Sequence, residues 1–305
     1  MPLTPEDAGW SLGTDVDYLR ELVADWVDGY DWPTQEAALA RLPHFRVPLD
    51  DLGIHFVHAR AVSPVGAPLP LILTHGWPDS FWRYSKVIPL LTDPGAYGAD
   101  PADAFDVVVP DMPGFGYSDA PAGPPLDSIA VADLWARLMS ILGYERFGAA
   151  GGDIGSHVSR YLALDHPDRV VAVHRMHVGL AAWIVEKLSA WSDCDGDVER
   201  AFTKDEILTN ITLYWLTGTI GSSMRMYKAN AAIPPVQLAR RVDVPSGFSL
   251  FQGDILCPPR AWLERVANVV RVTGPARGGH FAPFEQPEVY AEELRDFFRP
   301  YRTKI

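Results

Sequence analysis

The sequence predicts an α/β fold, in which a mostly parallel sheet is flanked by helices and interrupted by a helical insertion. Short apolar runs alternate with helical patterns over the first half of the chain, which is typical of βαβ units. The alternation stops after Met176 and returns near Ser246, and the chain between them shows helical patterns without strands. The 305 residues are enough for one large domain that carries an insertion.

Residues 1–50 are predicted to form a polar, tryptophan-rich helical segment that packs on the core. Tyr18, Leu19, Leu22 and Trp26 recur at helical spacing. Asp15 stands where its side chain can cap the helix that they form.

The core is expected in two parts, residues 51–177 and 233–305, separated by a small helical cap over residues 178–232. Apolar or β-branched runs predict strands at 54–58, 69–74, 105–110, 147–150, 170–174, 246–251 and 269–272. Periodic patterns predict helices at 81–91, 129–142, 156–164, 180–191, 204–216, from about 260, and at 287–298.

Composition excludes several classes of protein. The net charge of −13 argues against binding to nucleic acid or to an anionic membrane surface. The two cysteines, Cys194 and Cys257, do not suggest a disulfide framework, and the N-terminus resembles no signal peptide. No apolar stretch is long enough to span a membrane. We therefore expect a soluble cytoplasmic protein, either a monomer or a homodimer.

The sharpest chemical signal is Gly-Gly-Asp153-Ile154-Gly, which lies between a predicted strand and a predicted helix. This is the nucleophile-elbow pattern of the α/β-hydrolase fold, with aspartate where serine often stands. The glycines permit a tight turn that projects the central side chain, and the helix N-terminus favours an anion there. Alternatively, Asp153 only caps that helix.

Two further residues follow in the order that this fold requires, which is nucleophile, acid and histidine. Asp254 follows the strand-like run at 246–251, and His280 precedes the last helix. Taken singly, Asp254 could cap the helix near residue 260, and His280 could be structural. Their order favours a catalytic triad of Asp153, His280 and Asp254.

The segment His75-Gly-Trp77-Pro78 follows an early strand. In the α/β-hydrolase fold this loop supplies one backbone N–H of the oxyanion hole, here that of Trp77. The residue after the nucleophile, Ile154, supplies the other. Pro78 suits a cis or sharply turned peptide. The alternative is a tight proline turn beside a core tryptophan.

Several longer motifs resemble the microsomal-type epoxide hydrolase family, and the similarity covers nearly the whole chain. They are GWSLGTDVDYLRELVADWVDGYDW, HGWPDSFWRY, PDMPGFGYSD, GGDIGS, GLAAWIVEKLSAWSDCDGD, TLYWLTGTIGSSMRMYKAN and GGHFAPFEQPE. The resemblance implies that Asp153 is the nucleophile, His280 the base and Asp254 its charge-relay acid. It also implies that Tyr227 polarises the epoxide oxygen, that no cofactor or metal takes part, and that the substrate is a small apolar epoxide.

The sequence departs from the family in three ways. The residue after the nucleophile is Ile154, where the family often has tryptophan, and the membrane anchor of microsomal members is absent. Relatives also carry a longer stretch after the strand ending near His174, which contributes a second ring-opening tyrosine. His177 could replace that tyrosine, whereas Tyr214 lies in an apolar helix and is expected to belong to the core.

Epoxide hydrolysis is thus the favoured activity, and three alternatives stay open. Haloalkane or haloacid dehalogenation uses the same triad, but Ile154 stands where a halide-binding tryptophan is typical. An esterase or lactonase would normally carry serine in the elbow. The third alternative is a non-catalytic α/β-hydrolase that binds a small apolar ligand.

Overall fold

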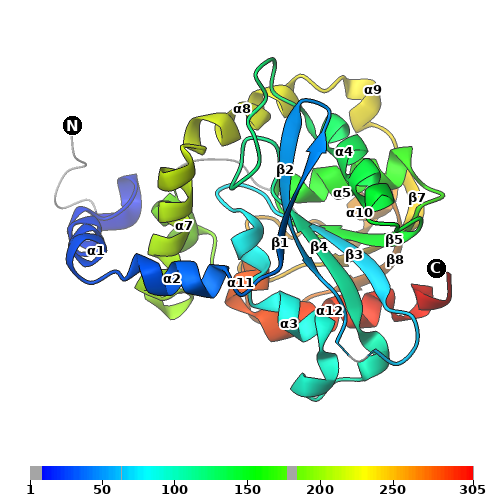
Figure 1. The fold of residues 1–305 in the computed structure, drawn as a ribbon, viewed down its shortest axis with the longest axis horizontal. Helices are drawn as coiled ribbons and strands as arrows, with labels where there is room; N and C mark the ends of the chain where they lie inside the picture. Colours follow the sequence, from blue (N-terminus) through cyan, green and yellow to red (C-terminus); the bar gives the residue numbers. More distant parts are fainter. Residues whose placement is uncertain (1–8, 63, 177–183, 305) are drawn as a thin grey trace.

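The computed structural model describes residues 9–62, 64–176 and 184–304. Eight strands form one sheet in the order β1-β2-β4-β3-β5-β6-β7-β8 (Figure 1). β1 pairs with β2, and β2 with β4, in antiparallel fashion, and every other neighbouring pair is parallel. The strands are β1 (His44–Leu49), β2 (Leu52–Ala59), β3 (Leu69–Thr74), β4 (Phe105–Pro110), β5 (Phe147–Gly151), β6 (Val170–Arg175), β7 (Val242–Ser249) and β8 (Ala267–Thr273).

Helices cover both faces of this sheet. The α-helices are α1 (Val16–Asp28), α2 (Trp32–Leu39), α3 (Val87–Thr92), α4 (Ser128–Ile141), α5 (Ile154–Asp165), α6 (Ile184–Ala190), α7 (Lys204–Thr217), α8 (Ile220–Ala231), α9 (Pro235–Leu238), α10 (Arg260–Val266), α11 (Ala282–Glu285) and α12 (Pro287–Phe298). Short 3-10 helices are η1 (Gly9–Leu12), η2 (Phe81–Tyr84), η3 (Pro94–Tyr97), η4 (Pro101–Asp103), η5 (Val198–Arg200) and η6 (Arg299–Lys304).

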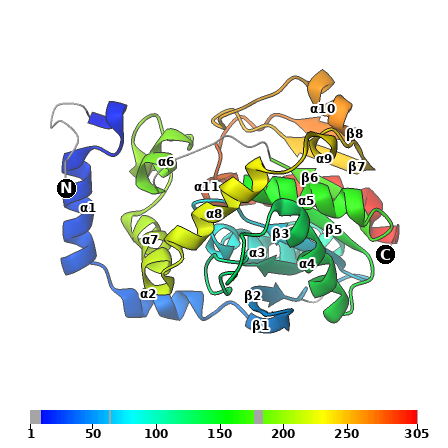
Figure 2. The ribbon, with the colours of Figure 1, turned by 90° about the horizontal axis from the view of Figure 1, so that it is seen from above.

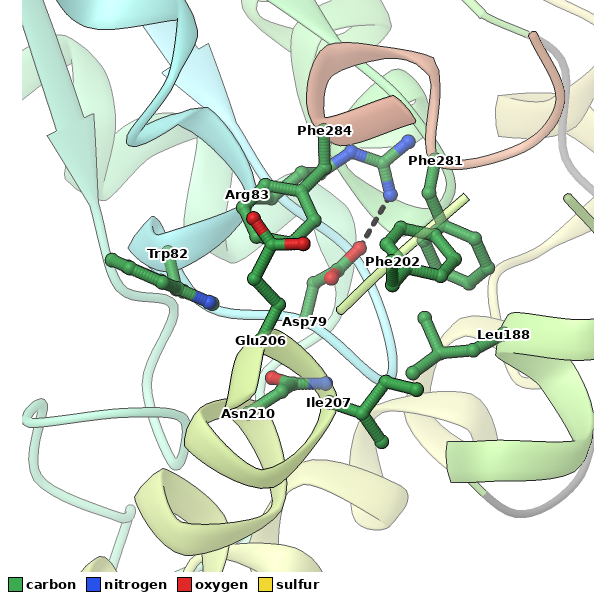
Figure 3. Close-up of a pocket in the computed structure, with 10 residues that line it drawn as sticks. All are labelled: Asp79, Trp82, Arg83, Leu188, Phe202, Glu206, Ile207, Asn210, Phe281 and Phe284. Carbon is green, nitrogen blue, oxygen red and sulfur yellow. Dashed lines mark hydrogen bonds and ion pairs between the residues drawn. The ribbon is translucent and has the colours of Figure 1, made fainter. Parts of the chain in front are cut away.

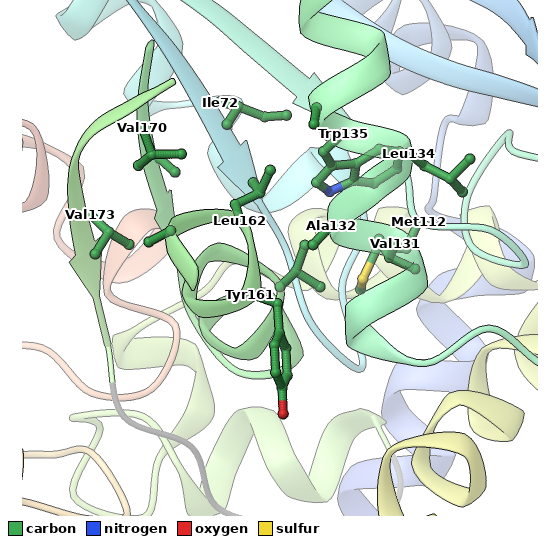
Figure 4. Close-up of a cluster of buried hydrophobic side chains, with 14 of the residues drawn as sticks. Ile72, Met112, Val131, Ala132, Leu134, Trp135, Tyr161, Leu162, Val170 and Val173 are labelled. Atoms are coloured by element: carbon green, nitrogen blue, oxygen red, sulfur yellow. The ribbon is translucent and has the colours of Figure 1, made fainter. Parts of the chain in front are cut away.

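The core consists of two apolar layers, one on each face of the sheet. Consecutive residues of β3 point to opposite faces, so Ile72 joins one layer and Leu71 joins the other. The first layer includes Trp135 of α4 and Tyr161 of α5 (Figure 4). The second includes Leu294 of α12, which packs beside α3. Burial on both faces explains why the parallel strands appear as continuous apolar runs in the sequence.

The predicted helix over 81–91 is interrupted in the structure, which has η2 at Phe81–Tyr84 and α3 at Val87–Thr92. Pro89 has no N–H to donate to the carbonyl of Ser85, so a continuous α-helix would lose a hydrogen bond there. The other predicted elements of the core lie where expected, within a few residues at their ends.

The N-terminal helices pack on the cap. Asp15 caps α1, as predicted, by accepting from the N–H of Tyr18 at 2.9 Å. Trp26 Nε1 donates to Thr212 Oγ1 of α7 at 3.0 Å, and α2 also contacts α7. Both views show α1, α2 and α7 together beside the sheet (Figures 1 and 2).

One finding differs from the helical segment expected over residues 1–50, because His44–Leu49 forms the edge strand β1. The helices of this segment contact the cap, and Trp32 and Leu39 of α2 also pack in the second layer of the core. Phe45 stacks on Phe56 of β2 at 5.7 Å between ring centroids, a cross-strand pair that stabilises the pairing.

The cap consists of α6 to α8 among the described residues, whereas α9 contacts core helix α5 through Arg160, which donates to the carbonyl of Leu238 at 3.0 Å (Figure 2). Thr203 begins α7 with a capping box completed by Glu206, and Gly218 ends it in the left-handed conformation. The predicted helix over 180–191 is seen as α6 from Ile184, and its first residues lie outside the described part of the chain. None of the described helices is long and apolar enough to cross a membrane.

Candidate active site

The predicted site residues follow the carboxyl ends of parallel strands, which meet at one edge of the sheet. Trp77 follows β3, Asp153 follows β5, Asp254 follows β7 and His280 follows β8. Ligands of open α/β sheets bind at this edge because the loops there converge. The fold therefore brings together side chains that are far apart in the sequence.

Asp153 occupies a strained turn between β5 and α5. Its φ of 53° lies in the left-handed region that aspartate seldom adopts. The neighbouring glycines permit the turn, because a Cβ on Gly155 would lie 2.0 Å from the carbonyl oxygen of Thr74. A Cβ on Gly76 would lie 2.2 Å from the Cβ of Asp153. This is the geometry of a nucleophile elbow, as the glycine pattern predicted.

The two oxygens of the Asp153 carboxylate have different surroundings. Oδ1 accepts a hydrogen bond from the Trp77 N–H at 2.9 Å, and the Ile154 N–H also donates to this carboxylate. Oδ2 has no hydrogen-bond partner among the described residues, although His280 Nε2 lies 3.4 Å away. The predicted oxyanion-hole donors thus face the Asp153 carboxylate, and Oδ2 lies on the side of His280. The Trp77–Pro78 peptide is cis.

His280 lies between two carboxylates. Its Nδ1 is 3.0 Å from Asp254 Oδ1, and because an ionised carboxylate only accepts, Nδ1 carries the proton. Nε2 then faces Asp153 and has no hydrogen-bond partner in the described part of the chain. The structure brings the three predicted triad residues together with the histidine in the middle.

The charges of the site reinforce one another. Burial raises the pKa of Asp153, but His280 and the N–H groups of Trp77 and Ile154 outweigh burial and hold that pKa below its ordinary value. Burial lowers the pKa of His280, but the two carboxylates outweigh it and raise that pKa to about 9. The resting site therefore holds an ionised Asp153 beside a protonated His280.

Tyr227 reaches the site from α8 of the cap. Its ring lies 6.1 Å from that of Trp77, and its buried hydroxyl has no hydrogen-bond partner among the described residues. Burial raises its pKa, and the charge of Asp153 raises it further. The hydroxyl therefore keeps its proton and is available to a ligand.

Tyr214 and His177 are the two residues that the sequence offers in place of the missing ring-opening tyrosine. The hydroxyl of Tyr214 donates to the carbonyl of Asp79 at 2.8 Å, and the side chain is buried, so it belongs to the core as expected. His177 lies outside the described residues.

Comparisons with known proteins agree with this geometry. Residues 1–84 match the family model "Epoxide hydrolase N terminus", and residues 70–201 match that of the α/β-hydrolase fold. A putative epoxide hydrolase of Stigmatella aurantiaca is 39% identical over 99% of the chain and 79% of its own length. The chain belongs to the epoxide hydrolase family.

Other epoxide hydrolases are also similar to this chain. Epoxide hydrolase 1 of Sus scrofa is 33% identical over 97% of the chain and 83% of its own length. The Aspergillus niger epoxide hydrolase superposes with a TM-score of 0.85 at 25% identity, covering 99% of this chain and 90% of the other. Juvenile hormone epoxide hydrolase of the silkworm Bombyx mori has the same fold, with a TM-score of 0.88 at 23% identity, over 100% of this chain and 90% of the other.

The match to the Stigmatella relative spans 355 residues, whereas this chain has 305. The relative therefore carries residues inside the matched region that this chain lacks. The expected place of these residues, after the strand ending near His174, stays a prediction.

Arg83 and Asp79 are residues of this epoxide hydrolase that sequence reasoning did not single out. Their buried side chains form an ion pair at 2.5 Å, drawn as a dashed line in Figure 3. Arg83 Nη2 also donates to the carbonyl oxygen of His280. Their spacing of four residues within HGWPDSFWRY was the available signal, because it places an acid and a base one helical turn apart.

A small, mostly apolar hollow lies beside this ion pair, between the cap and the core (Figure 3). Its walls include Leu188, Phe202 and Phe281 but neither Asp153 nor Tyr227. It is therefore a neighbouring hollow and not the place where bonds are made.

Proposed function

We propose that this site converts an epoxide into a vicinal diol through an ester formed on Asp153. One observation carries the proposal. Asp153 Oδ2, His280 Nε2 and the Tyr227 hydroxyl are buried polar atoms without hydrogen-bond partners among the described residues. Oδ2 and Nε2 face each other as a loose ion pair at 3.4 Å, and the Tyr227 hydroxyl has no partner among the described residues. An unpaired buried polar group costs about 1–3 kcal/mol, which supports a ligand that completes this hydroxyl.

In the first step, Asp153 Oδ2 attacks a carbon of the epoxide ring. A new C–O bond forms to the carboxylate while the ring C–O bond breaks and its electron pair goes to the departing oxygen. The lowered pKa of Asp153 keeps the nucleophile ionised. Tyr227 donates a hydrogen bond and then its proton to the departing oxygen, which becomes a hydroxyl group and leaves Tyr227 as a phenolate.

The second step depends on the charge that the first step removes. An ester on Asp153 is neutral, so one of the two carboxylates that raise the pKa of His280 is lost. His280 can then release its proton, which restores the Tyr227 hydroxyl, and take one from a water molecule. The hydroxide attacks the ester carbonyl, and the N–H groups of Trp77 and Ile154 stabilise the oxyanion at Oδ1. The ester bond breaks, and the proton of the added hydroxide passes to the departing oxygen, which releases the diol and restores the Asp153 carboxylate.

The proposed substrate is a small apolar epoxide, and no cofactor or metal enters either step. The net charge of −13 supports a protein that does not bind nucleic acid or an anionic membrane surface. Both cysteines are free, which supports a reducing cytoplasmic setting, and the proposed assembly is a monomer or homodimer.

The test is a single turnover in H₂¹⁸O with styrene oxide-like and aliphatic epoxides. An ester intermediate delivers an unlabelled carboxylate oxygen to the diol and leaves ¹⁸O on Asp153. A diol that carries ¹⁸O after one turnover would instead mean direct attack by water. Neither diol nor adduct with any epoxide would favour a non-catalytic ligand-binding protein, and halide release from haloalkanes would favour a dehalogenase.

Tyr227→Phe is expected to slow ester formation by about 10² to 10⁴-fold, the usual contribution of a general acid. Hydrolysis of ester already formed should be unchanged, and so should the fold, because the hydroxyl has no partner among the described residues. Rapid-quench kinetics with intact-protein mass spectrometry separates the two rates. Tyr214→Phe is the matched control, and it should lower stability by about 1 kcal/mol while leaving ester formation nearly intact. An equal loss in both variants would contradict the role of Tyr227.

The two steps are expected to respond differently to pH. Ester formation should be constant between about pH 5 and 8, because neither group that acts in it changes its charge there. The pKa of Asp153 is lowered below this range, and the pKa of Tyr227 is raised above it. Hydrolysis needs neutral His280, so its rate should rise with pH and level off below the pKa of about 9 that the free enzyme has. Single-turnover rates across the pH series check this. A hydrolysis rate that does not change with pH would exclude His280 as the base.

A further inference from the structure

The carboxylate of Glu285 holds the loop that carries His280. Oε2 accepts from the N–H of Gly279 at 3.0 Å, and Oε1 accepts from the N–H of Phe281 at 2.8 Å. These are the residues on either side of the histidine. Oε2 also accepts from the N–H of Asp193 in the cap at 2.9 Å. One carboxylate therefore joins both flanks of the catalytic histidine to the cap.

The cap holds the same loop at two more points. The Asp193 carboxylate accepts from the N–H of Gly278 at 2.9 Å, and the Trp191 carbonyl accepts from the N–H of His280 at 2.8 Å. The Trp191 ring also lies edge-on to the imidazole, with 5.0 Å between ring centroids. All four consecutive N–H groups of residues 278–281 thus have acceptors from Glu285 or from the cap segment 191–193.

These hydrogen bonds do not take part in the proposed chemistry, but they fix where the imidazole lies. Its Nδ1 must stay 3.0 Å from Asp254 while Nε2 faces Asp153 at 3.4 Å. Catalytic groups generally lose efficiency when displaced by about 0.5–1 Å. From the other side of the loop, Arg83 donates to the carbonyl of His280, and the N–H of Gly253 donates to the carbonyl of Gly278 at 3.0 Å.

We propose that Glu285 is a positioning residue for His280, and that it acts through backbone N–H groups shared with the cap segment 191–193. This inference rests on the two-step function proposed above. Since His280 acts only as the base, losing Glu285 should slow hydrolysis of the ester and leave its formation by Asp153 nearly unchanged.

The number of acceptors makes the idea sharply testable. Glu285 uses both oxygens, whereas glutamine offers one oxygen and one NH₂ group that cannot accept. In Glu285→Gln at least one N–H therefore loses its acceptor. Asp193 uses only Oδ2 toward the loop, so Asp193→Asn can keep that bond with its amide oxygen. If only the negative charge mattered, both amide substitutions would slow hydrolysis equally. If the hydrogen bonds matter, only Glu285→Gln should slow it.

The experiment measures both rates by single turnover, with intact-protein mass to follow the ester. Glu285→Gln should slow hydrolysis by about 10- to 100-fold, with ester formation within about 3-fold of wild type, so that ester accumulates. Asp193→Asn should stay within about 3-fold in both steps. Glu285→Asp should recover part of the hydrolysis rate, and Glu288→Gln, at an exposed position on α12, should match wild type.

Two results would overturn the inference. The first is a Glu285→Gln variant that slows ester formation as much as hydrolysis, which would indicate a general structural role. The second is a variant that accumulates no ester although His280→Gln does. If His280→Gln also forms no ester, the two-step function itself fails, so the failure of the two proposals can be told apart.

Discussion

Asp153→Asn is expected to abolish diol formation, with a loss in kcat/KM on the order of 10⁴-fold or more, the scale seen when a nucleophile is removed. Opening an epoxide requires attack at a saturated carbon by a group that is already anionic, and a neutral amide is a poor nucleophile. The amide oxygen can still accept from the Trp77 N–H, so the fold should persist. Diol production and circular dichroism check the two expectations.

The same variant tests whether the charge of Asp153 raises the pKa of His280, because asparagine is neutral like the proposed ester. The pKa of His280, followed by NMR, should fall below the value of about 9 in the wild type. Asp168→Asn is the matched control, since Asp168 is exposed just before β6, at the opposite edge of the sheet. Full turnover in Asp153→Asn would exclude this residue as the nucleophile, and an unchanged pKa of His280 would contradict the coupling between the two groups.

Most of the core could be predicted from sequence because its signals are local. Each buried parallel strand is a short apolar run, and α12 was predicted at its observed bounds from its helical period alone. The edge strand β1 was missed because half-exposed residues do not form such a run. Its residues His44–Leu49 become a strand through pairing with β2, which is a property of the fold and not of the segment.

The candidate site was predictable because three motifs each follow a strand in an order that one fold requires. Asp153, Asp254, His280 and the Trp77 N–H meet as the order implied. The position of Tyr227 was implied by resemblance only, and its unpaired hydroxyl beside the site supports that role.

The supporting groups were less predictable, since their partners are backbone atoms distant in the sequence. Glu285 and Asp193 both stand in motifs that drew attention for other reasons. Nothing in the motif GLAAWIVEKLSAWSDCDGD, which contains Asp193, reveals that this carboxylate accepts from the N–H of Gly278. Such contacts depend on how the cap is placed over the core, which local patterns do not encode.

His280→Gln is expected to stop the reaction halfway, so that the protein gains the mass of one substrate molecule. Without a base, hydrolysis of the ester should slow by about 10² to 10⁴-fold. Ester formation should continue, because Asp153 Oδ2 is free and the N–H groups of Trp77 and Ile154 remain. Losing the positive charge beside Asp153 should slow that step only modestly. Intact-protein mass spectrometry after incubation with an epoxide measures the adduct, and peptide mapping should place it on Asp153.

Two controls make this result specific. The double variant Asp153→Asn with His280→Gln should gain no mass, because the attacking oxygen is gone. His166→Gln should turn over normally without an adduct, since His166 ends α5 away from the site and bonds to Asp133. An active enzyme whose His280→Gln variant forms no adduct would mean that water attacks the epoxide directly. The free Oδ2 of Asp153 would then act by orienting that water, and the neutral ester could no longer explain how a histidine with a raised pKa becomes a base.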